Sequence, residues 1–217
     1  MNTRNTFFGL MLIGSISTLP VALASGYSSD SYANSDQSQM LKTSTEALSL
    51  EEETDLIFMR EEEKMARDVY LFFSELWSNP VFSNIAESEQ QHMDSMAVLL
   101  NTYGLTDPVQ DDSIGLFTNP DLAELYITLT NRGQASVLEA LKVGALIEEV
   151  DMRDIQHAID QAEHADIIQT YENLLRGSRN HLRAFVRAIE EMGVVYEAQV
   201  LDQTEVDAIV DSPMERG

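Results

Sequence analysis

The stretch LIFMREEEKMARDVYLFF, residues 56–73, places apolar side chains three and four positions apart along the chain. That spacing follows the turn of an α-helix and predicts a helix with one apolar stripe facing a core. The stripe consists of Leu56, Met59, Ala66, Tyr70 and Phe73. Glu63 lies in the same stripe, so the helix places a carboxyl group at a position where the spacing predicts an apolar side chain.

Three later segments carry the same kind of stripe, and polar residues interrupt each stripe near its middle. The interrupting residues are Glu89 and His92 before Tyr103, Glu148 and Asp151 after Gly133, and Ser178 and His181 before Met192. Four amphipathic helices broken at a similar depth indicate a helical bundle with a polar layer across its core.

Capping and turn residues divide the chain into helical elements. We expect long helices over residues 49–77, 79–103, 134–150 and 166–192, shorter ones over 119–133, 151–161 and 203–210, and a loop over 105–118. Segment 151–161 is expected to be separate from the preceding helix or kinked against it. The predicted fold is all-α, a four-helix bundle over residues 47–193 with a short extra helix in the crossover connection, followed by a C-terminal extension over 194–217.

The first 24 residues have the features of a secretory signal peptide. Arg4 precedes an apolar run over residues 7–16, and Ala22-Leu23-Ala24 is a small-x-small cleavage motif. Residues 25–46 are rich in Ser, Asn, Gln and Tyr and predict a flexible linker. The apolar run is short for a membrane span, and its retention as an uncleaved anchor is the alternative. We therefore expect an exported protein, periplasmic or extracellular, with no membrane segment after cleavage.

The composition excludes several classes of function. With 13 basic and 37 acidic residues, the formal net charge is −24, which disfavours nucleic acid and anionic lipid as partners. The 217-residue chain has no cysteine, so disulfides, thiolate catalysis, iron–sulfur clusters and cysteine-bound zinc are excluded. Any metal has to be bound by carboxylate and imidazole groups, which suit iron, manganese or zinc.

The interrupted stripes predict a metal site. Isolated carboxylates in a core are costly, whereas a cluster of them is stable when it shares cations. Glu89 and His92 lie three residues apart, so both project from one face of a helix. The predicted ligands are Glu63, Glu89, His92, Glu148 and His181, with Glu89 and Glu148 bridging, and Asp151 is a further candidate. The alternatives are a glutamate at the rim of the bundle, a hydrogen-bonded core histidine, and Asp151 as a helix cap.

At these residues the sequence resembles rubrerythrin and its relatives in the ferritin-like superfamily. The motifs that carry the resemblance are EKMARDVY at 63–70, NIAESEQQH at 84–92, GALIEEVD at 144–151 and GSRNHL at 177–182. Residues 50–192 are more similar still to an uncharacterised prokaryotic family placed in that superfamily. The resemblance implies a ferritin-like bundle that binds two metal ions, with iron as the expected metal and manganese or zinc as alternatives.

Ser178 departs from the family pattern, because rubrerythrins carry a glutamate there. Either one metal keeps an open coordination position, or the site holds only one metal well. Asp151 is also shorter than the glutamate that it replaces. The chain has no cysteine-rich electron-transfer tail, so a peroxidase activity would need an external reductant.

The resemblance implies that a di-iron centre reacts with oxygen or peroxide, as a ferroxidase or a peroxidase-like oxidoreductase. Tyr70 is the candidate catalytic residue, since its hydroxyl could hydrogen-bond a ligand; packing in the core is the alternative. A non-redox metal carrier or sensor is the alternative function, and a bundle that acts through protein partners is a third. Pairing into a homodimer stays open.

Several charged residues near the stripes are expected at the solvated surface. They are Glu61, Glu62, Glu149 and His164. Arg67 is expected in a surface ion pair, with an orienting contact to Glu63 as the alternative.

Overall fold

The computed structural model describes residues 46–216. The predicted signal peptide, residues 1–24, and the predicted linker, apart from Glu46, lie outside the described residues. Between residues 46 and 216 the chain forms six α-helices and no strand, which confirms the all-α class. None of these helices is both long and apolar enough to cross a membrane.

The helix boundaries follow the predicted ones closely. They are α1 Leu50–Trp77, α2 Pro80–Thr102, α3 Pro120–Gly133, α4 Val137–Gln161, α5 Ala165–Glu191 and α6 Gln203–Val210. Segment 151–161 is not a separate helix, as one of the two alternatives had it, but the second half of the continuous helix α4.

Local side-chain chemistry sets where the helices begin. Ser49 and Glu52 form a reciprocal capping box that starts α1. Asn79 and Asn119 cap α2 and α3, each directly before a proline at the first helical position. Ser136 accepts a hydrogen bond from the backbone of Glu139, so α4 begins three residues later than expected.

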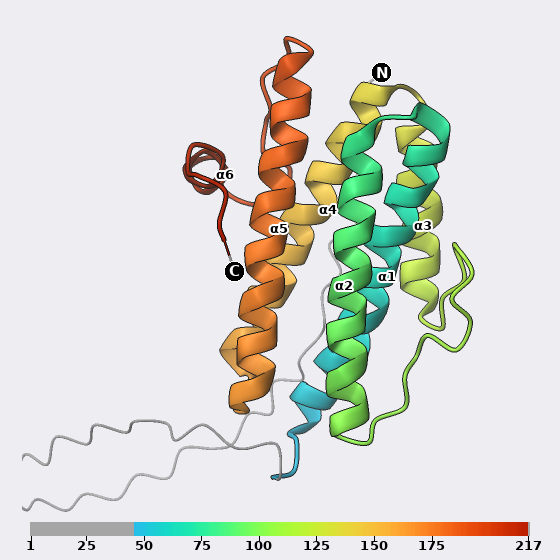
Figure 1. Ribbon diagram of the computed structural model, residues 1–217, viewed down its shortest axis with the longest axis vertical. Coiled ribbons are helices and arrows are strands. Elements are labelled where there is room, and N and C mark those ends of the chain that lie inside the picture. The colour runs from blue at the N-terminus through green and yellow to red at the C-terminus, as the bar shows by residue number, and fades with distance from the viewer. Residues whose placement is uncertain (1–45, 217) are drawn as a thin grey trace, which may run out of the picture. The chain divides into compact units, whose positions relative to one another are not determined.

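The four long helices form a bundle in which α1 packs along α2, and α4 packs along α5 (Figure 1). The two pairs meet through contacts of α1 with α4 and of α2 with α5. Helix α3 lies against α1 and α4, in the connection that crosses from one pair to the other, as predicted. Helix α6 packs against α5.

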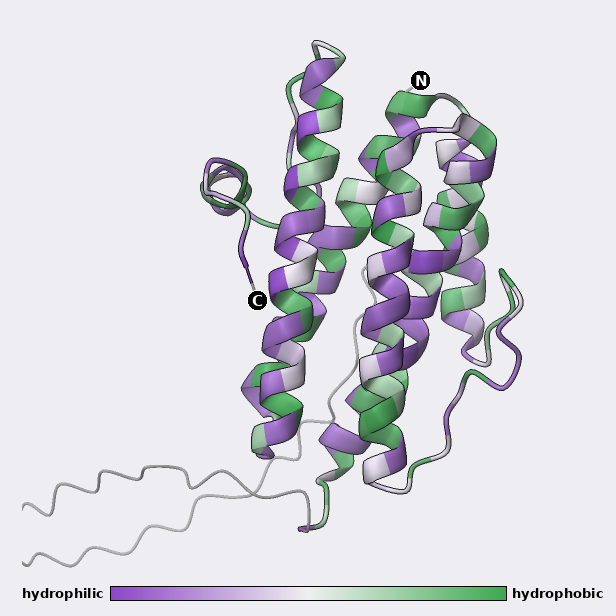
Figure 2. Cartoon of the chain, viewed as in Figure 1, coloured by the Kyte–Doolittle hydropathy of each residue, from purple (hydrophilic) through white to green (hydrophobic). Residues whose placement is uncertain are grey.

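Two apolar clusters fill the bundle. One contains Tyr70 and Phe185, and the other contains Met59 and Met96. On α1, Glu63 lies between Met59 of one cluster and Tyr70 of the other, and the interruptions on α2 and α5 also fall between the two clusters. Figure 2 shows the corresponding hydrophilic band across the middle of α2. The polar residues therefore form a layer that separates two apolar regions.

Several buried charges on α1 hold the loop over residues 103–119. Lys64 and Asp68 are fully buried; Lys64 donates to Asp68 and to the Ser113 carbonyl, and Asp68 accepts from Gly115 N–H. Glu61 is also buried and accepts from the backbone N–H groups of residues 118 and 119. The expectation that Glu61 is solvated was wrong, because loop amides far along the chain replace its water.

Arg67 is buried beside the same loop, and the hydrogen bonds of its guanidinium group go to residues other than Glu63. It donates to Asp68, to Gln90 and to the carboxylate of Asp112. The expected ion pair is present, with Asp112 as the exposed partner. The expectation that Arg67 itself lies at the surface was wrong, because its side chain is buried.

Glu149 and His164 are likewise buried, against expectation. Glu149 accepts from Tyr196 O–H and from three successive backbone N–H groups of residues 199–201. His164 Nδ1 lies 2.8 Å from Glu52 Oε1. Both contacts hold segments that follow the ends of helices, so these charges serve the fold. Glu62 is buried as well, and its surroundings are described further below.

Candidate metal centre

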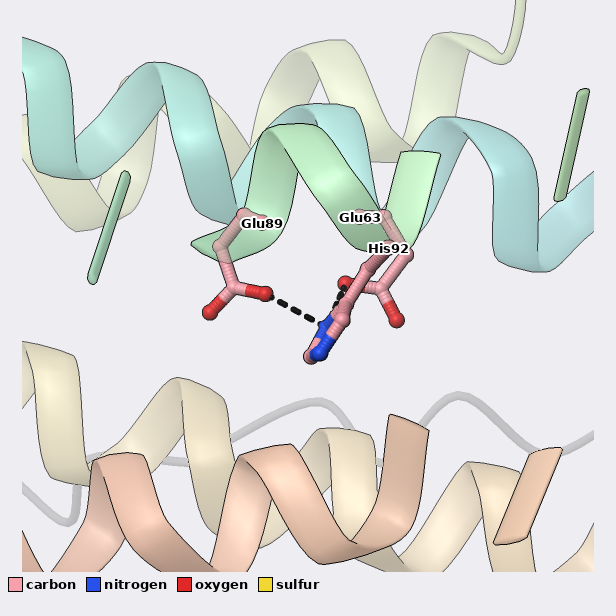
Figure 3. A group of neighbouring side chains, drawn as sticks. All are labelled: Glu63, Glu89 and His92. Atoms are coloured by element: carbon pink, nitrogen blue, oxygen red, sulfur yellow. Dashed lines mark hydrogen bonds and ion pairs between the residues drawn. The ribbon is translucent and has the colours of Figure 1, made fainter. Parts of the chain in front are cut away.

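The four long helices bring five predicted ligands into two overlapping groups. One group is Glu63, Glu89 and His92, and the other is Glu89, Glu148 and His181. Within each group the atoms that could bind a metal all lie within 4.8 Å of one another. Glu89 belongs to both groups, and Figure 3 shows it beside Glu63 and His92.

Glu89 directs one carboxylate oxygen to each histidine. Its Oε2 lies 2.8 Å from His92 Nδ1, and its Oε1 lies 2.8 Å from His181 Nδ1. Glu63 Oε2 completes the first group at 3.2 Å from His92 Nδ1, and Glu148 Oε2 completes the second at 3.4 Å from His181 Nδ1. The two groups are thus near-equivalent, each with two carboxylates and one imidazole.

Helix register explains why Glu89 and His92 meet. Residues three apart on an α-helix project from the same face, so both side chains of α2 point toward α1 and α5. The rings of His92 and His181 are stacked, with centroids 5.5 Å apart and an interplanar angle of 30°. The layer is therefore packed as a unit across α2 and α5.

Outer partners fix the orientation of the second group. Tyr70 O–H donates to Glu148 Oε1 at 2.5 Å, and His181 Nε2 lies 2.8 Å from Ser88 Oγ. The inward atoms are therefore Glu148 Oε2 and His181 Nδ1. Burial and the nearby carboxylate of Glu148 raise the pKa of Tyr70 well above its ordinary value, so its hydroxyl stays a donor. Such outer contacts orient metal ligands in proteins.

Two of the predictions about the ligands differ from the geometry. Asp151 is buried, but its Oδ2 accepts a hydrogen bond of 2.5 Å from Ser178 Oγ. Glu148 lies in one group only, since its second oxygen binds Tyr70. Of the predicted bridging pair, Glu89 alone spans both groups, and the geometry gives Glu148 a terminal position.

The site is short of hydrogen-bond donors. Glu63 Oε1 is buried without a hydrogen-bond partner, and His181 Nδ1 has only the carboxylates of Glu89 and Glu148 in reach. The buried carboxylate of Glu149, by contrast, accepts from a hydroxyl and three backbone amides. A buried charge normally finds such partners, or binds a metal. The donor set of the site thus fits cations better than it fits an ordinary polar core.

The charges of the site depend on one another. Burial raises the pKa of Glu63 to about 7. Burial also opposes ionisation of Glu89, but His181 and His92 outweigh it and hold the pKa of Glu89 far below its ordinary value. Burial lowers the pKa of His181, yet Glu89 and Glu148 raise it to about 10. Without metal, protonated histidines therefore supply the positive charge that the carboxylates need.

Gly177 leaves the space that His92 occupies. A Cβ on Gly177 would lie 2.5 Å from His92 Nε2, which is closer than real contacts allow. Gly177→Ala should therefore displace the imidazole and weaken metal binding in the first group by roughly 10- to 100-fold, the effect of losing an orienting partner. Equilibrium dialysis against a divalent metal measures this.

The stability of the same variant separates the two effects of the substitution. Alanine within a helix is favoured over glycine by about 0.5–1 kcal/mol, so the metal-free variant should fold at least nearly as well as the parent. Metal binding of wild-type strength in both groups would show that His92 does not depend on this space.

The fold and the two groups define an all-α bundle with a buried carboxylate–histidine centre. The chain belongs to the family described as "Uncharacterized protein domain (DUF2202)", whose model matches residues 52–213. It is 49% identical over 170 residues to "Uncharacterized protein MJ0754" of Methanocaldococcus jannaschii, covering 78% of this chain and 92% of that protein. The crystal structure of hypothetical protein MJ0754 matches with a TM-score of 0.77 and 48% identity, over 78% of this chain and 97% of that chain.

Sequence reasoning missed the residues that support the site. Ser88 precedes Glu89, and Gly177 lies one turn before His181. The serine gives no periodic signal, because it lies beside the stripe rather than in it. The glycine in the middle of a long predicted helix was a usable signal, since such a position costs helix stability and suggests a close approach.

Proposed function

We propose that this chain is a di-metal carboxylate protein of the ferritin-like type, with iron as its native metal. One observation carries the proposal: Glu89 directs one oxygen to each of two histidines, and each histidine faces a further glutamate. Manganese and zinc are the alternative metals, because carboxylate and imidazole ligands suit all three.

The chemistry of the donors fits two cations. Glu63, Glu89 and Glu148 supply three negative charges, and the inward Nδ1 atoms of both histidines supply two neutral donors. Glu89 would bridge, and the other four residues would be terminal ligands. Each group has only three protein residues, which leaves coordination positions for solvent or substrate.

Iron, when bound, supplies the electrons for a reaction with oxygen or peroxide. The protein's own residues position and shield the centre. Tyr70 holds Glu148 in one orientation through its hydroxyl, and the apolar clusters on both sides of the layer limit the access of water. We accordingly propose a ferroxidase or peroxidase-like oxidoreductase that relies on an external reductant. The signal-like N-terminus supports a site of action outside the cytoplasm.

A metal carrier or sensor is the second candidate function. The hydrogen bond from Ser178 to Asp151 favours a carrier or sensor. This bond occupies the carboxylate of Asp151, which would otherwise be a further ligand. Fewer carboxylates stabilise an oxidised centre less well.

Anaerobic reconstitution with iron(II), followed by exposure to air, tests the proposal. The oxidoreductase requires two irons per chain and a rapid rise of ferric absorbance in air. Tight binding of iron that stays ferrous would support the carrier or sensor instead. A folded protein that takes up no metal would contradict both functions.

In the metal-free protein, stability should fall as the pH rises from about 5 to about 10. The folded protein keeps protons on His181 up to a pKa of about 10 and on Glu63 up to about 7, whereas the ordinary values are 6.5 and 4.5. The folded state thus binds more protons than the unfolded state in this range, and stability decreases with pH. The contribution of His181 is complete below pH 6.5 and lost as the pH approaches 10.

Thermal unfolding in the presence of a chelator measures this pH dependence. Bound metal should flatten it, because metal replaces the protons at the same atoms. The His181→Gln variant is the control and should lose the contribution of His181, so its stability should fall less steeply above pH 6.5. His92 keeps part of the dependence: burial lowers its pKa, but Glu63 and Glu89 raise it well above the ordinary value. Stability that increased between pH 5 and 8 in the chelated protein would contradict the raised pKa values.

A further inference from the structure

Three acidic residues lie where α1 meets α4, beside the candidate metal centre. We call Glu62, Asp151 and Asp154 the α1–α4 acidic stripe. Glu62 is 3% exposed and Asp151 is 6% exposed, whereas the side chain of Asp154 is 25% exposed. Exposure thus increases along α4 with distance from the centre.

Helix geometry makes the stripe continuous with the centre. Glu148, Asp151 and Asp154 occupy positions i, i+3 and i+6 of α4. Each step of three residues advances about 4.5 Å along the helix and turns by about 60°, so the row leads from the core face toward the surface. On α1, Glu62 directly precedes the ligand Glu63.

Glu62 is buried without the partners that other buried acids have. Its Oε2 has no hydrogen-bond partner, and neither does Glu63 Oε1. The neighbouring Glu61 accepts two backbone N–H groups and thereby holds a loop, whereas Glu62 holds none. Its side-chain hydrogen bond is with another carboxyl group, that of Asp154.

This inference rests on the proposed metal centre: we propose that the α1–α4 acidic stripe is the transit site through which a hydrated divalent cation reaches the two groups. Two carboxyl groups at hydrogen-bond distance can share a cation in place of a proton. Asp154 receives the ion near the surface, where its pair with Arg153 is partly exposed and therefore weakened by solvent. Glu62 then passes the ion inward to the unpartnered oxygen of Glu63.

The rate of metal uptake tests the transit site. Metal-free protein is mixed with Co²⁺ in a stopped-flow instrument, and visible absorbance follows the filling of the centre. Glu62→Gln should slow uptake roughly tenfold, because a concentrated negative charge raises the association rate of a counter-ion by about that factor. The final content should stay at two Co²⁺ per chain, since Glu62 belongs to neither group.

Glu75→Gln is the matched control, because Glu75 is an exposed acid on the same helix and the change in charge is the same. Its uptake rate should stay within about twofold of the wild-type rate. Added salt should slow the wild-type protein more than Glu62→Gln, since the stripe acts through charge.

A second pair of variants keeps the test decisive if Glu62→Gln folds poorly. Asp154→Asn should also slow uptake, whereas Asp160→Asn, at an exposed position of α4, should not. Wild-type rates in both Glu62→Gln and Asp154→Asn would overturn the transit site, as would a lower final content reached at the wild-type rate. A wild-type protein that bound no Co²⁺ would instead overturn the proposed metal centre.

Discussion

Glu89→Ala should abolish the stoichiometric binding of both metals. The carboxylate of Glu89 lies 2.8 Å from Nδ1 of each histidine and belongs to both groups, so its removal takes one ligand from each. Removal of a ligand should cost more than the 10- to 100-fold loss in affinity that follows removal of an outer partner. Anaerobic equilibrium dialysis followed by metal analysis measures the metal content per chain.

Single-group variants provide the matched contrast. Glu63→Ala should lose the metal of the first group only, and Glu148→Ala that of the second only, because each residue belongs to one group. Glu89→Gln controls for packing, since the amide fills the same volume without the charge. Two metals bound to folded Glu89→Ala protein would refute the bridging role of this residue.

Asp68→Ala should be strongly destabilising although it lies outside the metal centre. Asp68 is fully buried and accepts hydrogen bonds from Lys64, Arg67 and the Gly115 amide. Its removal leaves Lys64, which is also fully buried, without its carboxylate. Removing one partner of a buried ion pair costs about 3–5 kcal/mol. In thermal unfolding, a domain of this size should lose roughly 10 °C.

Asp112→Ala is the control, because its carboxylate also pairs with Arg67 but its side chain is 62% exposed. It should cost no more than about 1 kcal/mol. The double variant Lys64→Met with Asp68→Leu should recover part of the loss, since it removes the charges of Lys64 and Asp68 together and leaves Arg67 its Asp112 partner. If Asp68→Ala were as mild as Asp112→Ala, the buried pair would not be what holds the loop to α1.

The fold was largely predictable because its signals are local. The stripe containing Leu56 and Phe73, the capping box at Ser49 and the asparagine–proline pairs all lie within a few residues of the features that they determine. The continuity of α4 was not predictable in the same way. Asp151 suggested a cap or a break, but its side chain is satisfied by Ser178, a residue on another helix.

The gathering of buried glutamates and histidines in one layer was predictable for a related reason. A glutamate or histidine in an apolar stripe conflicts with its own helix, and that conflict is visible in the sequence. The burial of Glu61 and Glu149 was not visible, because loop amides 50 or more residues away satisfy both carboxylates. Only the folded chain separates these anchored acids from Glu62 and Glu63, each of which has one buried oxygen without a hydrogen-bond partner.

Anomalous diffraction from crystals of the iron-loaded protein tests the central claim most directly. At the iron absorption edge, we predict two peaks per chain. One should lie among Glu63, Glu89 and His92, and the other among Glu89, Glu148 and His181, with ligand atoms about 2.0–2.3 Å from each peak. A folded, iron-soaked protein with no peak in this layer, or with peaks only on the acidic surface, would contradict the account.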